Sequence, residues 1–394
     1  MFFTQQSASQ FGAGDRSPYG DFWFKPIGFG LDGRSVSKND ALRLAAVYGC
    51  VNLVSGHMAL LPIEFIKRGT FEPIKNHPLA YLLNYRPNPF QNAFEYRRMK
   101  QGHIELRGNA YSEIIYNREG GIDALMPRHP DKIRPIILSD GSDYYYQYTD
   151  AGETRKISRQ SMWHIRGLSD NGIVGLSVLD YAQQSMQLGL SAQEYGVRFY
   201  VNNGQPTSGW VEFPGRYKDS AQRKMVRDSL QEAQSGANAG KLLLLDQGMK
   251  YHQVGITNDN AQFLETRKFQ TSDIAMFFGV PPTKLGDLSR STFSSLGAEQ
   301  QAYVNDTLLT RSAMWKSSIQ NELLFYDEEI DVRFNFGALL MGDLESRAKG
   351  YQLLMGTASI TPDEIREREG LQPLGMNKPM YPLNMGVVGE EKKD

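Results

Sequence analysis

The chain has 394 residues, 40% of them hydrophobic and 22% charged, which is enough to bury a core and suggests roughly two or three domains. Its formal net charge of −1 excludes the strongly basic character of a tight, sequence-independent nucleic-acid binder, so any DNA contact has to be local or weak. The single cysteine, Cys50, lies among apolar residues, which excludes an intramolecular disulfide and favours a buried thiol in a reducing compartment.

Residues 1–36 combine glycine, serine, phenylalanine and polar residues without periodicity, which is typical of a flexible arm. They contain no basic segment followed by a sustained apolar one, so we expect no secretory signal. The best apolar candidate, residues 58–66, is interrupted by Pro62 and Glu64. No stretch therefore approaches the roughly 20 residues of a membrane-spanning helix, and we expect a soluble protein.

The first regular element is predicted to begin near Ser37, where Ser37 and Asp40 resemble a capping box, and to end before Pro62. From about residue 104 the pattern changes to short β-rich runs. These runs are 111–116, 133–138, 144–148 and 162–165, with turn signals at Gly120-Gly121 and Asp140-Gly141 between them. The Tyr144–Tyr146 run could stack on bases, but pleated alternation in a half-buried strand explains it better.

A long helix of roughly 40 Å is predicted over residues 176–203. An α+β insert follows at 205–256, with strand-like runs near 210–213 and 251–256 and an amphipathic helix near 219–234. A second helix is predicted from about Asn260 to a stop at Gly279, which is followed by Pro281-Pro282. The pattern therefore indicates two helices that flank an insert.

Residues 283–297 are small and polar, which is typical of a mobile loop, and another long helix through 315–324 is predicted after them. The C-terminal region contains Thr361-Pro362-Asp363-Glu364, which combines an N-cap, proline at the first helical position and a capping box. With Gly370 as its stop, this motif predicts a terminal helical unit.

Searches for catalytic motifs give no candidate. The six histidines lack metal-ligand spacing, and no Walker loop is present. Residues 28–33 fit G-x-G-x-x-G, but no strand precedes them and no acidic residue follows about 20 positions later, so the match is interpreted as chance. Residues 175–179 only superficially resemble a nucleophile elbow, and the acidic run 327–329 is interpreted as a solvated turn. We expect no metal, no cofactor and no enzymatic activity.

Several stretches together resemble the portal protein family of long-tailed, siphovirus-type bacteriophages, in that family's order across about residues 40–375. The strongest is Phe277-Phe278-Gly279-Val280-Pro281-Pro282 with Leu285-Gly286-Asp287. The other matching stretches are 46–54 with Leu61-Pro62, His77-Pro78-Leu79 with Arg86-Pro87-Asn88-Pro89, Gly108-Asn109-Ala110-Tyr111, 172–179, 341–347 and 361–366.

The resemblance implies an α+β, multi-region portal fold assembled as a ring, usually of about twelve copies. It implies a mixed α/β wing, a long helical stem, a small α+β clip, a tunnel loop and a helical crown. The boundaries expected here are a 1–36 arm, a 37–175 wing, stem helix 1 at 176–204, a 205–256 clip, stem helix 2 at 257–280, a 281–297 tunnel loop, a long helix at 298–337 returning to the wing, and a 338–394 crown.

The family's function implies a DNA-facing tunnel loop, for which the candidates are Lys284, Ser289, Arg290 and Thr292. Arg267 and Lys268 are candidates for the stem lining of the channel, where they would contact phosphates without reading bases. A clip surface that docks other components would contain Arg223, Lys224, Arg227 and Lys241. For each cation the alternative is a solvated surface charge or an intersubunit salt bridge.

The expected partners are other copies of the chain, double-stranded DNA without sequence preference, the terminase large subunit, a head-tail adaptor and the major capsid protein, with no membrane. The expected location is the portal vertex of the virion after assembly in the bacterial cytoplasm. Two alternatives stay open: another oligomeric virion component, such as a head-tail adaptor or minor capsid protein, and an unidentified α+β enzyme. Adaptors are usually much shorter and lack two long helices flanking an insert.

Overall fold

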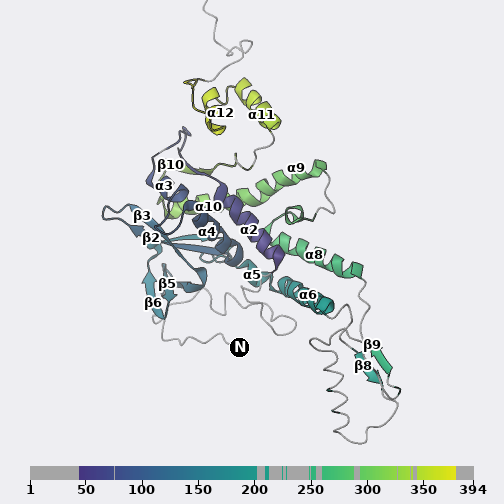
Figure 1. Cartoon of the computed structure of the whole chain (residues 1–394). Coiled ribbons are helices and arrows are strands. Elements are labelled where there is room, and N and C mark those ends of the chain that lie inside the picture. Colours follow the sequence, from purple (N-terminus) through teal and green to yellow (C-terminus); the bar gives the residue numbers. More distant parts are fainter. Residues whose placement is uncertain are drawn as a thin grey trace, which may run out of the picture. The chain divides into compact units, whose positions relative to one another are not determined.

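A computed structural model describes residues 44–74, 76–201, 209–212, 224, 228, 248, 250–253, 260–287, 293–325, 327–337, 339 and 344–378 (Figure 1). The chain divides into two compact units, Met1–Phe334 and Asn335–Asp394.

The N-terminal half of the first unit contains two packed helices and two three-stranded antiparallel sheets, one ordered β3-β2-β7 and the other β4-β5-β6. Its elements are α2 (Ala45–Leu60), β1 (Ile63–Lys67), α3 (Pro78–Asn84), α4 (Ala93–Arg107), β2 (Asn109–Tyr116), β3 (Ile122–Arg128), β4 (Ile133–Ile137), β5 (Tyr144–Asp150), β6 (Glu153–Ile157) and β7 (Met162–Arg166).

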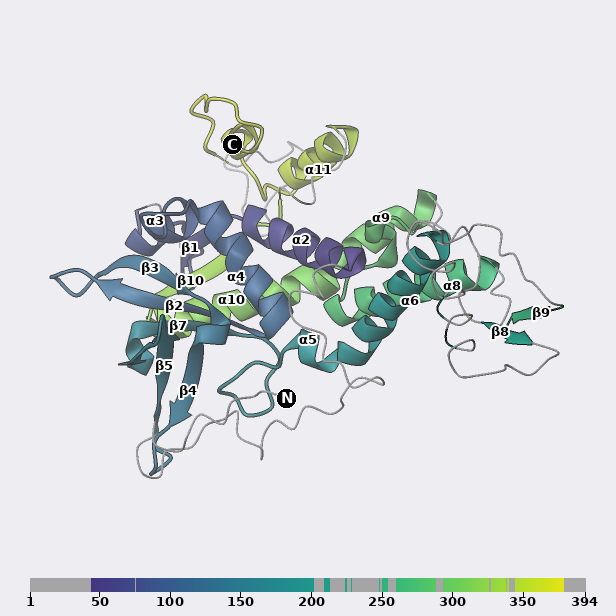
Figure 2. The same ribbon diagram turned by 60° about the horizontal axis from the view of Figure 1, so that its bottom comes forward.

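The second half of the first unit contains mainly helices. Its elements are α5 (Val178–Tyr181), α6 (Gln183–Val201), β8 (Gly209–Glu212), β9 (Lys250–Gln253), α8 (Asn260–Phe278), η5 (Pro282–Leu285), α9 (Phe293–Ala302), η6 (Tyr303–Leu308), α10 (Leu309–Glu322) and β10 (Ile330–Phe334). Figures 1 and 2 both show α6 and α8 side by side. The second unit contains α11 (Leu344–Gly356) and α12 (Pro362–Arg368).

Helix α4 packs against α2 in the first half of the unit. Both of its ends are specified by local residues. Asn92 and Glu95 form a complete capping box at its start. At its end Gly108 adopts a positive φ of 69°, and a Cβ there would lie 2.0 Å from the Leu176 carbonyl oxygen. Only glycine fits this turn, because the chain before α5 passes directly over it.

The two three-stranded sheets are joined through Glu113 of β2. Its carboxylate accepts hydrogen bonds from Arg128 of β3 at 2.6 Å and from Arg155 of β6 at 2.6 Å. Both guanidinium groups lie over the ring of Tyr148, at 5.0 and 5.1 Å from its centroid. One carboxylate and one aromatic ring therefore fix the two arginines, and with them the two sheets.

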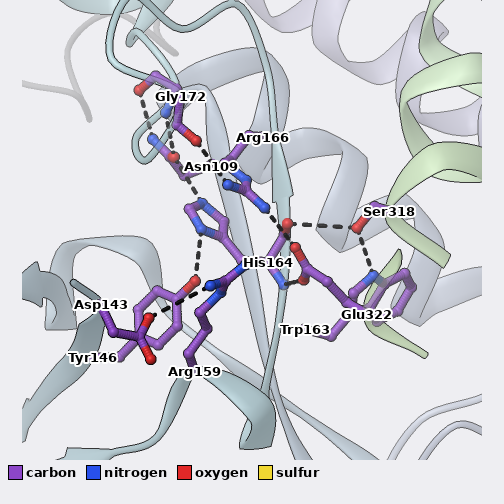
Figure 3. Close-up of polar contacts among 11 residues, drawn as sticks. Asn109, Asp143, Tyr146, Arg159, Trp163, His164, Arg166, Gly172, Ser318 and Glu322 are labelled. Carbon is purple, nitrogen blue, oxygen red and sulfur yellow. Dashed lines mark hydrogen bonds and ion pairs between the residues drawn. The ribbon is translucent and has the colours of Figure 1, made fainter. Parts of the chain in front are cut away.

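His164 of β7 is fully buried, and both of its ring nitrogens have partners (Figure 3). Nε2 lies 2.9 Å from the Asn109 side-chain oxygen, and Nδ1 lies 3.1 Å from the Tyr146 hydroxyl. The amide oxygen can only accept, so Nε2 donates its proton and Nδ1 accepts from the tyrosine. Burial, with the charge of Arg166, lowers the pKa of His164 well below 6.5. The imidazole is therefore neutral in the folded protein.

The same strand holds α10 against the sheet (Figure 3). Glu322 of α10 accepts from the backbone N–H of His164 at 2.5 Å and from the Arg166 guanidinium at 2.6 Å. The Trp163 indole N–H donates to the Ser318 hydroxyl at 2.8 Å. Trp163, His164 and Arg166 of β7 are thus all paired with α10 of the other half of the chain.

Several predicted elements are confirmed. The four β-rich runs correspond to β2, β4, β5 and β7, the helix before Gly279 is α8, and the capping box at Thr361 begins α12. Cys50 is fully buried and the Asp327–Glu329 run is exposed. Strands β8 and β9 fit the insert, whereas most of its predicted helix lies outside the described residues.

Other predicted elements differ in their bounds. The capping box predicted at Ser37 and Asp40 lies outside the described residues, and α2 begins at Ala45 after the extended backbone of Leu44. The helix predicted over 176–203 begins after its N-cap Ser177, is interrupted at Ala182 and ends at Val201. The helix within 298–337 ends at Glu322, and β10 follows it because residues 330–334 pair with β1.

Burial of Lys100 in α4 lowers the stability of the fold, because its side chain is fully buried and its Nζ has no hydrogen-bond partner among the described residues. Its Nζ lies 5.0 Å from the ring centroid of Trp163. Burial lowers the pKa of Lys100 well below its usual 10.5, and the charge of Glu322 only partly opposes this. At neutral pH the folded state therefore bears a penalty that the unfolded state does not.

We expect Lys100→Met to raise the free energy of unfolding by about 1 kcal/mol, because a side chain of similar volume removes the buried ammonium without losing a hydrogen bond. Equilibrium urea denaturation at pH 7 measures it. The matched control is Lys316→Met, because Lys316 is partly exposed and pairs with Asp331 at 2.9 Å, so its removal should cost less than about 1 kcal/mol. A clear loss of stability in Lys100→Met would contradict the expectation.

Candidate functional site

The end of α8 turns sharply and presents a short polar segment at the surface. Gly279 has a φ of 64°, and the Val280 N–H donates to the Ala275 carbonyl at 2.9 Å, which closes the helix. Pro281 and Pro282 cannot donate backbone hydrogen bonds, so the helix cannot continue. The chain instead makes the single 3-10 turn η5, which ends at Gly286 with a φ of 92°.

Lys284 lies in this turn and its side chain is exposed. Its Nζ contacts the side-chain oxygen of Gln300 and lies 5.8 Å from the ring centroid of Tyr303. One residue earlier, the Thr283 hydroxyl donates to Glu299 at 2.6 Å. Two neighbouring side chains of the turn are therefore held by α9 and η6, which leaves the ammonium ordered but in contact with water.

Beneath the turn, the ring of Tyr303 is buried against α2. Its hydroxyl lies 3.0 Å from Nδ1 of His57, and burial together with the nearby Lys284 charge lowers the pKa of His57. Gly49 of α2 leaves room for Leu285, since a Cβ at Gly49 would lie 3.1 Å from Leu285 Cδ2. The turn therefore packs on α2.

Arg311 of α10 supports the turn from the other side. Its guanidinium donates to the buried Glu105 carboxylate at 2.9 and 3.2 Å and to the Phe278 carbonyl at 2.8 Å. The Thr307 hydroxyl donates to the carbonyl of Gly279. The carbonyls of Phe278 and Gly279 at the end of α8 are therefore capped by side chains from the returning helix.

The returning helix is itself irregular where it makes these contacts. Residues Tyr303–Leu308 form a π-helical segment between α9 and α10, a rare geometry that is frequent at functional sites. Tyr303 and Thr307 both lie in this segment, so the widened turn carries the two side chains that hold η5 and Gly279.

The predicted loop at 281–297 is shorter in the structure than expected, because Pro282–Leu285 forms η5 and α9 already begins at Phe293. Lys284 and Lys268 are both exposed, on separate elements, and Lys224 is exposed as well. Arg267 lies in α8, but its side chain is outside the described part of the chain. Ser289, Arg290, Thr292, Arg223, Arg227 and Lys241 lie outside the described residues.

Sequence patterns did not identify Glu105, Thr307 and Arg311, which hold the site. The residues next to each of them in the sequence indicate a helix and no special role. Only the packing of α4 against α10 brings Glu105 and Arg311 together. The Gln101 amide donates to Glu105 at 2.7 Å with i,i+4 spacing, which is a local signal close to this site.

No group of three or more His, Cys, Asp or Glu side chains suited to a metal ion is found within the described ranges. Among the helices that the structure describes, none combines the length and apolar character needed to cross a bilayer.

Comparisons with known proteins agree on one family. Residues 45–370 match the family described as Phage portal protein. The portal protein of Enterobacteria phage HK97 is 29% identical over 87% of this chain and 82% of its own length. The crystal structure of an HK97-family phage portal protein from Corynebacterium diphtheriae matches with a TM-score of 0.61 at 14% identity, over 78% of this chain and 98% of the other.

A further structural match is to a chain in the neck of a native gene transfer agent particle, computed with C12 symmetry. The TM-score is 0.53 at 22% identity, over 86% of this chain and 96% of the other. At this level of identity the structural likenesses show the fold, which agrees with the match to the family.

We expect Arg311→Met to lower the free energy of unfolding by about 3 kcal/mol, because it leaves the Glu105 carboxylate buried without its partner. The double variant Arg311→Met with Glu105→Gln should recover part of that loss. Urea denaturation measures both, and Arg333→Met provides the control, since its pair with Glu64 is at the surface and should contribute less than about 1 kcal/mol. Equal losses in the single and double variants would argue against a charge effect.

Proposed function

Because the chain belongs to the phage portal protein family, we propose that copies of it assemble head to tail into a ring at one capsid vertex. Double-stranded DNA passes through the central hole during packaging and ejection. The observation that carries this proposal is the family match over residues 45–370, which includes both helices that flank the insert and the turn with Lys284. The ring has about twelve copies, as the C12 symmetry of the matched neck suggests.

Ring symmetry is what gives the exposed Lys284 an effect on DNA. One ammonium group per subunit becomes a circle of charge, which meets the phosphate backbone at any rotation of the duplex. Contacts to phosphates carry no sequence information. A net charge of −1 per chain keeps the overall attraction weak, so DNA is guided without being trapped.

Ser289, Arg290 and Thr292 extend the DNA-facing set from the same loop, and Lys268 and Arg267 extend it along α8. These assignments are supported by the exposure of Lys284 and Lys268 and by the position of the loop between α8 and α9. The circle of Lys284 ammonium groups, one per subunit, is the main part of this DNA-facing set, because each Lys284 side chain is ordered by Gln300 and Tyr303.

The regional assignments follow the family's architecture. We assign residues 37–175 to the wing, 176–204 and 257–280 to the stem, 205–256 to the clip, 281–297 to the tunnel loop and 338–394 to the crown. The pairing of β10 with β1 supports the return of residues 298–337 to the wing. The helices α11 and α12 support a helical crown.

The clip faces the terminase large subunit during packaging and a head-tail adaptor afterwards. Arg223, Lys224, Arg227 and Lys241 are its docking surface, which is supported by their gathering in one short insert. The wing contacts the major capsid protein. The protein belongs to the virion, and its ring assembles in the bacterial cytoplasm before the capsid fills.

The protein acts as a conduit and docking platform rather than as an enzyme or a cofactor-binding protein, so nucleotides should be neither bound nor hydrolysed by it alone. An adaptor or minor capsid protein is less well supported, because the match to portal proteins extends over 87% of this chain.

The purified chain should form annular particles in negative-stain electron microscopy. The native mass should be about 530 kDa, which is twelve times the 44.5 kDa of one chain. Light scattering coupled to gel filtration measures the mass. A chain that stays monomeric across the micromolar range would overturn the ring proposal.

Lys284→Glu should leave the ring intact and weaken its binding to a short duplex. We expect a loss of roughly tenfold at low salt and a plot of log affinity against log salt that is shallower by about 1 or more. Fluorescence anisotropy measures the affinity. The matched control is Arg118→Glu in the exposed hairpin between β2 and β3, which should change neither quantity. If both reversals act alike, Lys284 does not line the channel.

A further inference from the structure

Four large aromatic side chains are exposed between the middle of α3 and the start of α4. They are Tyr81, Tyr85, Phe90 and Phe94, which are 58%, 69%, 77% and 39% exposed. The rings of Tyr81 and Tyr85 stack on each other with their centroids 5.7 Å apart. Within the described ranges, no other stretch of this length exposes four large aromatic side chains. We call these four residues the aromatic face.

The segment that carries the aromatic face is held rigidly by Asn88. The Asn88 side chain is buried, its amide N–H donates to the Leu125 carbonyl at 3.3 Å, and its oxygen accepts from the Phe90 backbone N–H at 3.0 Å. The Ala93 N–H donates to the Tyr85 carbonyl at 3.0 Å, which brings the end of α3 against the start of α4. The aromatic face is therefore pre-formed, so a partner that packs on it does not have to order these residues.

The part of the chain before Leu44 has a composition that suits this face. Residues 1–43 lie outside the described residues, and they contain eight aromatic residues, a higher share than the 11% of the whole chain. Three of the eight are adjacent, in the run Phe22-Trp23-Phe24. Segments that remain disordered in water contain few aromatic residues. The composition of this arm therefore favours packing on an apolar surface.

The arm is long enough to reach the aromatic face of its own chain. It joins α2 at Leu44. The other end of α2 lies beside the start of α4, because Arg97 donates to the carbonyls of Ala59 and Leu61. Helix α2 has 16 residues and is therefore about 24 Å long. The segment from Phe24 to Leu44 spans up to about 66 Å when extended, so it covers this distance with slack.

We propose that the run Phe22-Trp23-Phe24 packs on the aromatic face of the same chain. Contacts between aromatic rings contribute beyond the area that they bury, and the covalent connection keeps the run at a high effective concentration near the face. A separate protein would have to bind without this connection. The arm then forms a strap over the exposed aromatic side chains, whether or not the chain is part of a ring.

The first test is limited digestion of the full chain with chymotrypsin, which cleaves after aromatic residues. Docking protects the bonds after Trp23 and Phe24. Phe90→Ser should raise the rate of cleavage at these bonds roughly two- to tenfold, as expected for the loss of one aromatic contact when cleavage follows the undocked population.

The matched control for the digestion is Phe71→Ser. Phe71 is 67% exposed and lies outside the aromatic face, so this variant should be cleaved at the wild-type rate. Equal rates in the wild type and in Phe90→Ser would overturn the proposal. An equal rise in both variants would also overturn it, because the effect would then not belong to the aromatic face.

The second test is disulfide crosslinking of the full chain with Lys25→Cys and Arg86→Cys combined, which places one thiol beside each partner of the contact. The native Cys50 will not interfere, because it is fully buried and burial raises the pKa of its thiol to about 12. Mild oxidation should give an intrachain disulfide that runs at monomer size on a non-reducing gel, and mass spectrometry of the linked peptides identifies it. Adding Trp23→Ala should lower its yield severalfold.

The Trp23→Ala variant separates docking from chance collisions of a tethered segment, since the two cysteines stay the same. An unchanged yield in this variant would overturn the proposal. Covalent multimers in place of the monomer-sized product would assign the run to another copy and overturn the intrachain contact. Both tests are independent of ring formation, so their failure leaves the proposed function unaffected.

Discussion

The structure depends on one buried ion pair between distant parts of the chain. Glu105 in α4 and Arg311 in α10 meet at 2.9 Å, and the same guanidinium reaches the carbonyl of Phe278 at the end of α8. Three helices are therefore fixed by one side chain. A buried charge pair of this kind contributes little net stability, but it permits only one arrangement of its partners. The position of the surface turn after α8 follows from that arrangement.

The turn with Lys284 combines a rigid base with an exposed cation. Proline and glycine stop α8, while Thr307 and Arg311 satisfy the carbonyls that the stop leaves open. The ammonium itself contacts the half-buried side chain of Gln300 and lies near the buried ring of Tyr303. In the ring proposed above, a charge presented from such a rigid base would keep its position as DNA moves past.

Local signals allowed much of the fold to be predicted. The stop at Gly279, the capping box at Thr361 and four of the strands follow from the chemistry of a few adjacent residues. Strand β6 was missed because most of its side chains are charged or polar and exposed. Helix α4 was missed although Asn92 and Glu95 form a capping box that could have indicated its start.

The sequence by itself determined where helices stop, which stretches resemble portal proteins, and that Lys284 lies in a turn after α8. Only the tertiary structure decided that Glu105 and Arg311 hold that turn and that β10 pairs with β1. The physical reason is the range of the interactions. Caps and turns act over a few residues, whereas ion pairs, sheet pairing and burial depend on which distant segments the folded chain brings together.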